Sequence, residues 1–111
     1  MKITLTFNNE QLTEKYETLG DVSTFNDLNV LEDFPKTEVL ILRAFYPIDK
    51  KILNWMPNLK VIGFAGTDLK HIDLEECEER GIKVISLKED VDEIVFNKVK
   101  NYLNYANKKI Q

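Results

Sequence analysis

A few residues of this chain could hold an organic acid. Arg43 lies in an almost wholly apolar segment, residues 38–44. A guanidinium there can hold a carboxylate or phosphate through two parallel hydrogen bonds; the alternative is a surface ion pair with one of the many acidic residues. Gly63 and Gly66 fall at the end of the next apolar segment. Glycine lets the backbone come close to a ligand, or to another part of the chain.

The other reactive residue types offer little chemistry. His71 is the only histidine and Cys77 the only cysteine. We predict that His71 is a cap or surface residue just before a helix, and that Cys77 is a buried apolar residue. A single thiol allows no disulfide within the chain, and no Cys/His cluster exists for structural zinc. We therefore predict no catalytic residue and no metal site.

The composition excludes several classes of function. The sequence has 111 residues, 43% of them hydrophobic and 31% charged, with a net charge of −4. These values are typical of one globular domain, which we place at residues 1–111. They indicate no basic surface for nucleic acid, and no apolar run approaches the roughly 18 residues of a membrane span. With no signal peptide, we expect a reducing, cytoplasmic location.

Apolar runs alternate with amphipathic segments along the chain. The pattern predicts strands at residues 2–7, 22–25, 38–44, 60–65 and 83–87, with helices between them and a long helix over 91–109. This alternation predicts an α/β fold: a three-layer, flavodoxin-like open parallel sheet with strand order 2-1-3-4-5, flanked by helices. Ligands of such sheets bind beyond the carboxyl ends of the strands.

Capping residues are predicted from their positions before helical patterns: Asn8 or Asn9, Asp49 and Asp73. Glu76, three residues after Asp73, completes a pattern like a capping box. Glycine is expected to stop two helices, at Gly20 and, in a left-handed conformation, at Gly81. Trp55, near the end of its helix, is predicted to lie in the core.

Two further features suggest a surface that needs covering. The last helix carries a wide apolar stripe, formed by Val95, Phe96, Val99, Tyr102, Leu103, Ala106 and Ile110. Small soluble proteins seldom expose a large apolar patch without a partner, so we expect a homo-oligomer or a partner chain to bind this helix. Phe45 and Tyr46 follow the third strand; they would cover a pocket, contact a partner, or pack on the neighbouring helix.

Three stretches of the sequence carry a more specific pattern. They are "VLILRA" followed by "IDKKIL", then "PNLKVIGFAG", then "HIDLEECEERGIKV". The first is similar to the strand-and-helix pair, arginine included, of the D-isomer-specific 2-hydroxyacid dehydrogenases. The second resembles that family's Pro-x-Leu-Lys-x-Ile-Gly-x-Ala-Gly, and the third its (N/H)-I-D-L-x-x-x-x-x-R-G-I-x-V. The resemblance is to the substrate-binding, or catalytic, domain; it needs no gap over residues 38–95 and is looser before them.

The resemblance implies both a site and a missing part. In the family, NAD binds a second, Rossmann domain with a Gly-x-Gly-x-x-Gly turn, which also holds the general acid histidine. The four glycines here do not make that motif, so we expect no cofactor in this chain. In the family, backbone N–H groups of the glycine loop approach the substrate carboxylate. The substrate-binding residues implied here are Arg43, Ala44, Ala65, Gly66, Thr67 and Asp68.

The sequence also departs from the family pattern. Asp68 stands at the second glycine position of the loop, and Lys70 at its first aspartate position. The charge of Asp68 would repel an anionic substrate by roughly 1–4 kcal/mol at about 4 Å. The Pro-Gly turn is replaced at residues 88–89, and the Ala-Glu-His signature at 96–98. A fragment of a working enzyme should keep its glycine loop, so these departures favour a stand-alone domain.

We therefore expect a stand-alone, non-catalytic relative of the substrate domain that binds a small carboxylate or phosphorylated acid. The alternatives are a self-associating or protein-interaction module that kept only the fold, and one part of a split NAD-dependent dehydrogenase. A phosphate-receiver role is rejected, because Arg43 stands where the acceptor aspartate should end the third strand and Asn8-Asn9 replace the acidic pair. That leaves no carboxylate site for magnesium.

Overall fold

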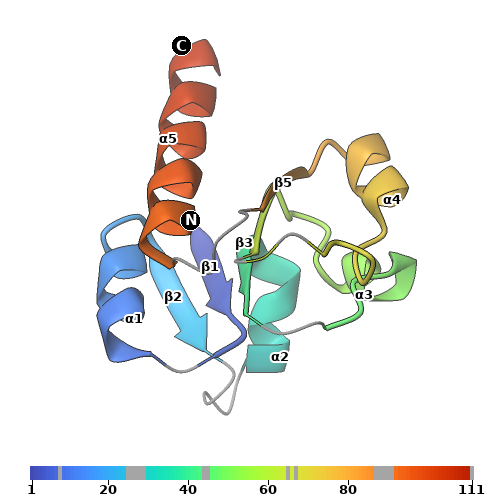
Figure 1. Ribbon diagram of the computed structural model, residues 1–111, viewed down its shortest axis with the longest axis horizontal. Helices are drawn as coiled ribbons and strands as arrows, with labels where there is room; N and C mark the ends of the chain where they lie inside the picture. The colour runs from blue at the N-terminus through green and yellow to red at the C-terminus, as the bar shows by residue number, and fades with distance from the viewer. Residues whose placement is uncertain are drawn as a thin grey trace.

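Strands and helices alternate along the chain in the computed structural model, which describes residues 1–7, 9–24, 30–43, 46–64, 66, 68–86 and 92–110. Figure 1 shows their arrangement. The elements are β1 (Lys2–Leu5), α1 (Glu10–Glu17), β2 (Asp21–Thr24), α2 (Val30–Asp33), the 3-10 turn η1 (Phe34–Lys36), β3 (Thr37–Leu42), α3 (Lys50–Trp55), β4 (Val61–Phe64), α4 (Leu74–Glu79), β5 (Lys83–Ser86) and α5 (Asp92–Ile110).

All described strands join one parallel sheet in the order β2-β1-β3-β4-β5. The predicted fold class and strand order are confirmed. Leu5 pairs with Ile41, and Leu42 pairs with Phe64. Because parallel strands end at the same edge, the loops that follow β1, β3 and β4 meet there.

Helices cover both faces of the sheet, as Figure 1 shows. On one face α1 and α5 enclose a core made by Ile3, Leu5, Leu12, Tyr16, Val39, Ile41, Val61, Ile85, Val95, Phe96, Val99 and Leu103. On the other face η1, α3 and α4 enclose a second core made by Phe34, Leu40, Leu42, Ile48, Leu53, Met56, Leu59, Ile62, Phe64, Ile72, Cys77 and Ile82. No helix in the described residues is long and apolar enough to cross a membrane.

The first half of α5 packs directly on the sheet over β4 and β5, and comes closest at Gly63 in β4. A Cβ atom at Gly63 would lie 2.9 Å from Ile41 Cδ1 and 3.1 Å from Val95 Cγ1. Val95 and Val99 are almost fully buried. Gly63 therefore serves the close passage of helix over strand, the second of the two roles considered for it.

Side-chain caps fix the start of three helices. Asn9 Oδ1 accepts from Leu12 N at 3.1 Å, and Asp49 Oδ1 accepts from Ile52 N at 3.0 Å. Both were predicted; Asn8 lies outside the described residues. Gly81 has the expected left-handed conformation, with φ of 72°, after α4 ends. These predictions from local sequence are confirmed. Such residues recur at helix ends because the ends leave backbone N–H and C=O groups without partners inside the helix.

The capping box before α4 is only half formed. Asp73 Oδ1 accepts from Glu76 N at 3.1 Å, as predicted. The reciprocal bond is replaced, because Asp73 N donates to Ile48 O at 2.9 Å. The Glu76 carboxylate instead accepts from Arg80 Nε at 2.9 Å, one turn further along the helix.

Two predictions about single residues are wrong. Helix α1 ends at Glu17, before Gly20; Gly20 is needed because a Cβ there would collide with the carbonyl oxygen of Met1. Trp55 is not in the core, since 46% of it is exposed. Its ring stacks on Phe34, with centroids 6.3 Å apart and planes 18° apart, so it covers the edge of the second core.

The packing at Gly63 predicts a loss of stability in Gly63→Ala. The added methyl group must displace Ile41 or Val95, and such overpacking costs about 1–3 kcal/mol. Urea unfolding followed by circular dichroism measures the change. Lys100→Ala, on the exposed side of α5, is the matched control and should stay within about 0.5 kcal/mol of the parent. Equal stability of Gly63→Ala and the parent would contradict the close packing of α5 on β4.

Two carboxylates near the amino ends of the strands are held ionised by their partners. Ser23 Oγ donates to Asp33 Oδ2 at 2.5 Å, and this bond is the main reason why the pKa of Asp33 is lowered. Lys60 Nζ donates to Glu38 Oε1 at 2.7 Å and is the main cause of the lowered pKa of Glu38. Lys2 also contacts both carboxylates.

These lowered pKa values predict a loss of stability in acid. A carboxyl group with a lowered folded-state pKa stabilises the fold above its unfolded pKa, about 3.9–4.3, and loses that contribution as pH falls through the folded value. The free energy of unfolding should therefore fall below about pH 4–5. Glu38→Gln should make this fall shallower. Urea unfolding at a series of pH values tests it, and an unchanged slope in Glu38→Gln would contradict the assignment.

Candidate functional site

The candidate site lies where the loops after β3 and β4 leave the sheet. Arg43 directly follows Leu42, and Leu42 pairs with Phe64 at the end of β4. Gly66 comes two residues later, so the sheet register brings Arg43 and the start of the glycine loop to the same edge. Three of the predicted binding residues, Ala44, Ala65 and Thr67, lie outside the described residues.

Arg43 is exposed at this edge and is held against an aromatic ring. Its Cζ atom lies 5.1 Å from the ring centroid of Phe7, which follows β1. A guanidinium over an aromatic face is stabilised by the ring quadrupole, by about 0.5–1 kcal/mol at exposed sites. An exposed guanidinium at the carboxyl edge of the sheet is a candidate to bind an anion.

Gly66 is held close to the strand it follows. Its N–H donates to Phe64 O at 3.2 Å. A Cβ atom at Gly66 would lie 2.7 Å from Phe64 Cε1, and Phe64 is only 2% exposed, so its ring has little room to move. The packing of Phe64 therefore requires a glycine here, whether or not a ligand binds.

His71 supports the same ring from the far side of the loop. Its ring packs edge-on against Phe64, with centroids 4.7 Å apart and planes 63° apart. The prediction that His71 is a cap or surface residue is wrong: Asp73 caps α4, and His71 is half-buried. Phe64, His71 and Gly66 thus form one packed unit under the loop.

A short parallel bridge ties the two loops of the site together. Ile48, in the segment after β3, pairs with Ile72, before α4. Ile48 N donates to His71 O at 2.8 Å, and Asp73 N donates to Ile48 O at 2.9 Å. Both isoleucines are buried. The bridge fixes how the segment that leads to α3 lies beside the segment that leads to α4.

Asp68 occupies the place of the glycine expected from the family pattern, and it has a local role. Its Oδ1 atom accepts from Lys70 N at 3.1 Å, a turn in which an aspartate bonds the backbone two residues on. The side chain is exposed, so its negative charge remains at the edge where an acid would bind. Asp68 therefore stabilises the loop.

Cys77 is buried in the second core, as predicted, and is 1% exposed. Burial, and then the nearby charge of Asp73, raise the pKa of its thiol, which disfavours the reactive thiolate at neutral pH. In the described part of the chain, no group of three or more His, Cys, Asp and Glu side chains is placed to hold a metal ion.

The described turns between strand and helix do not fit the pyrophosphate of a dinucleotide. Such a group needs glycines close to a helix N-terminus with open N–H groups. At α1 the amide of Leu12 is already bonded by Asn9, and at α4 the amide of Glu76 is bonded by the carboxylate of Asp73. Whether the chain binds no cofactor at all stays a prediction.

Comparison with known proteins identifies the family. The family described as D-isomer specific 2-hydroxyacid dehydrogenase, catalytic domain, matches residues 5–95. The chain belongs to this family. The resemblance deduced from the three sequence motifs is thereby confirmed.

Individual relatives match parts of this family domain. The D-3-phosphoglycerate dehydrogenase of Archaeoglobus fulgidus is 32% identical over 57 residues, which are 51% of this chain and 11% of that protein. The hydroxypyruvate reductase of Thermotoga maritima is 33% identical over 57 residues, 51% of this chain and 19% of that protein. The chain thus spans less than a fifth of either relative.

A solved relative shares the fold. The crystal structure of D-lactate dehydrogenase from Aquifex aeolicus, complexed with NAD and lactic acid, superposes with a TM-score of 0.63 at 22% identity. The match covers 78% of this chain and 28% of that one. At this identity the likeness supports the sheet and its helices, not the ligand contacts.

Sequence reasoning missed the aromatic residues that build the site. Phe7 supports Arg43, and Phe64 fills the space that Gly66 leaves. Phe7 ends the predicted first strand, and strand order 2-1-3-4-5 makes that strand the neighbour of the one that leads to Arg43. The contact of Phe7 with Arg43 could therefore have been predicted from the sequence. The contact of Phe64 with Gly66 could not, because it depends on the side-chain rotamer of Phe64.

The packing of Gly66 on Phe64 predicts coupled mutations. Gly66→Ala alone should lower the free energy of unfolding by about 1–3 kcal/mol, because the new methyl group meets a buried ring. In a Phe64→Leu background the same change should cost at least about 0.5 kcal/mol less. A double-mutant cycle from urea unfolding measures the difference. Strict additivity would show that the ring does not require the glycine.

Proposed function

We propose that this chain is a substrate-binding domain that holds a small organic acid without reacting with it. The observation that carries the proposal is the placement of Arg43: it is exposed, it lies over the ring of Phe7, and it follows the strand that pairs with the strand before the glycine loop, at the carboxyl edge of the parallel sheet. That edge is where ligands of such sheets bind. Gly66 and the neighbouring Ala44, Ala65 and Thr67 are the proposed companions of Arg43.

The relatives narrow the class of acid. Their names describe enzymes of phosphoglycerate, hydroxypyruvate and lactate, and the last was crystallised with lactic acid. These compounds share a carboxylate next to a carbon that carries an oxygen. A guanidinium can bind such a carboxylate through two hydrogen bonds. We therefore propose a short 2-hydroxy or 2-oxo acid, with or without a phosphate.

Catalysis within these 111 residues is not part of the proposal. Hydride transfer requires a bound nicotinamide, and the sequence contains no Gly-x-Gly-x-x-Gly turn. The alternative is a split NAD-dependent dehydrogenase, in which another domain or chain supplies the nucleotide. Both versions place the acid at Arg43. The expected cytoplasmic location also stays a prediction.

Two features predict weak binding. The N–H of Gly66 donates to Phe64 O, so an acid must compete for that donor. The carboxylate of Asp68 is exposed beside the loop, and like charges repel at this range. We propose that this loop retains the fold of a substrate loop while its affinity depends on Arg43.

Self-association through the C-terminal helix is the second candidate function, and the structure leaves it less surface than the sequence suggested. Val95, Phe96, Val99 and Leu103 are buried in the chain's own core. The last turns of α5 extend beyond the sheet in Figure 1, and Tyr105 there is 61% exposed. A partner would therefore have to bind this extension.

Thermal unfolding with D-lactate, hydroxypyruvate, 3-phosphoglycerate and NADH tests the acid-binding proposal. An acid that binds the native state must raise the melting temperature. Arg43→Ala should abolish the increase, and Asp68→Gly should enlarge it, because a like charge is removed. Lys51→Ala, which removes an exposed cation from α3, is the matched control and should behave as the parent.

The outcomes separate the candidates. A response to an acid that survives in Arg43→Ala would contradict the proposed site. A response to NADH would show a nucleotide site that the described turns do not provide. No response to any acid, with a molecular mass that rises with concentration and falls in Tyr105→Ser, would favour self-association.

A further inference from the structure

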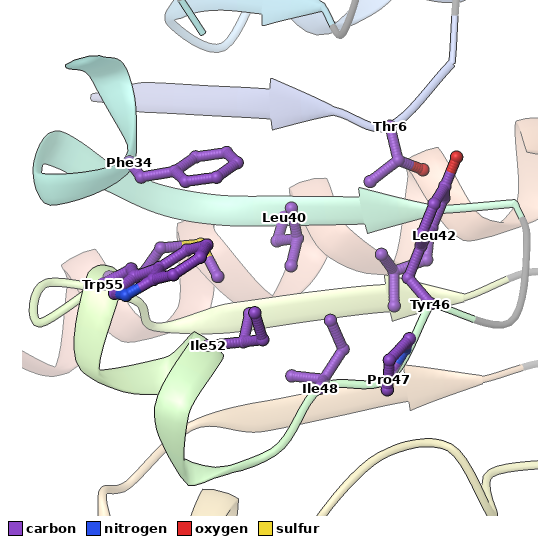
Figure 2. A pocket seen from close by; sticks show the side chains of 10 residues that line it. Thr6, Phe34, Leu40, Leu42, Tyr46, Pro47, Ile48, Ile52 and Trp55 are labelled. Carbon is purple, nitrogen blue, oxygen red and sulfur yellow. The ribbon is translucent and has the colours of Figure 1, made fainter. Parts of the chain in front are cut away.

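A pocket lies on the second face of the sheet, apart from the acid site. Its volume is about 330 Å³. Figure 2 shows Leu40 of β3 at its floor, Phe34 and Trp55 at one end, and Thr6 with Tyr46 at the other. Ile52 of α3 lines its side. Small-molecule sites in proteins measure roughly 300–1,000 Å³, so the pocket suits a molecule of one or two rings.

The pocket exists because the helices on this face are short. Helix α2 has 4 residues and η1 has 3, and Figure 2 shows η1 beside the amino end of β3 only. Helix α3, with 6 residues, covers the sheet on the other side of the gap. Between η1 and α3, Leu40 of β3 lies at the floor of the pocket and is only 2% exposed. Thr6 and Leu40 therefore face a space that a longer helix would fill.

The lining is mainly apolar, with the hydroxyl groups of Thr6 and Tyr46 at one end and the indole N–H of Trp55 at the other. No lysine, arginine, aspartate or glutamate is among its described lining residues. Thr6 is 6% exposed, and its hydroxyl donates to Ile41 O at 3.1 Å. Because that proton is already used, the Thr6 oxygen can only accept from a ligand. A ligand that bonds to Thr6 must therefore bring a donor.

We propose that this pocket binds a small uncharged aromatic or alicyclic alcohol. The ring lies over Leu40, against Ile52 and the Trp55 end, and its hydroxyl donates to Thr6 Oγ1. An anion is disfavoured, because no cation among the described lining residues compensates the loss of its hydration. The pocket is thus a second site, with chemistry opposite to that of the acid site at Arg43.

Trp55 provides a direct reporter. It is the only tryptophan of the chain, so a proton–nitrogen NMR spectrum contains a single indole N–H signal, from the end of the pocket. Two probes distinguish the contribution of the hydrogen-bond donor to binding from that of the ring. They are 4-ethylphenol and 4-ethylanisole, in which a methyl group replaces the phenolic proton. Saturable movement of the Trp55 signal with 4-ethylphenol is the expected result, with weaker binding of 4-ethylanisole.

Thr6→Val tests the polar end with little risk to the fold. Valine has nearly the same shape, and Ile41 O keeps the hydrogen bond from Thr6 N at 3.0 Å. Loss of one neutral hydrogen bond should weaken 4-ethylphenol roughly two- to tenfold, and leave 4-ethylanisole unchanged. Equal binding of 4-ethylphenol by Thr6→Val and the parent would overturn the proposed orientation.

Ile52→Phe tests the location by filling the pocket from its side. Ile52 is only half-buried, so the larger ring can enter the space without displacing the core. Both probes should lose binding, whereas the matched control Lys51→Ala on the same helix should bind both. Binding of either probe that survives in Ile52→Phe would place it elsewhere and overturn the proposal.

Two further measurements keep this proposal independent of the acid site. Arg43→Ala should bind 4-ethylphenol as the parent does, even if it no longer responds to acids. Dilution of the free protein should leave the Trp55 signal in place. A signal that moves on dilution would show that a second copy of the chain covers this face, and a probe that never moves it up to its solubility limit would show that the pocket takes no such ligand.

Discussion

The contact of α5 with β4 at Gly63 decides how the rest of the molecule is arranged. A glycine in the middle of a strand lets Val95 approach the sheet where any other side chain would hold the helix away. The first half of α5 therefore packs on β4 and β5 and, together with α1, encloses the first core. The apolar stripe of α5, which by itself suggested an interface, is largely used inside the chain. The exposed large hydrophobic residues of α5 in the described part of the chain are Ile94 and Tyr105.

The same arrangement makes the two faces of the sheet unequal. One face is covered by α5, with 19 residues, and by the 8-residue α1. The other relies on helices of 4 to 6 residues, and a pocket lies over β3 beside Trp55. The wrong prediction for Trp55 has this origin: its aromatic ring suggested the core, but α3 ends there and the ring lies on Phe34 at the rim. A sequence pattern gives the side of a helix that is apolar, not how far the helix reaches across a sheet.

The sheet and its order could be predicted from the sequence because their signals are local and repeated. Asn9, Asp49 and Gly81 each act within one turn of chain, and each is confirmed. Predictions failed where a distant segment competes for the same group. The amide of Asp73 bonds to Ile48 O instead of completing the capping box. Gly20 does not end a helix; a glycine is needed there because a side chain would collide with the backbone of Met1. Such competition appears only when segments far apart in sequence are brought together.

The glycine loop shows why a family motif and a binding site must be argued separately. Gly66 matches the family pattern, yet the Phe64 ring alone would require it, since no Cβ fits between them. The residue therefore says little about a ligand. Arg43 says more about a ligand, because its charged side chain is exposed at the carboxyl edge of the sheet and lies over the ring of Phe7. Asp68, by contrast, stands where the family has a glycine, and its side chain stabilises a turn by accepting a hydrogen bond from Lys70 N. If the chain binds an acid, the free energy of binding must come from Arg43. The glycine loop can contribute only if it moves or gives up the hydrogen bonds that it makes within the chain.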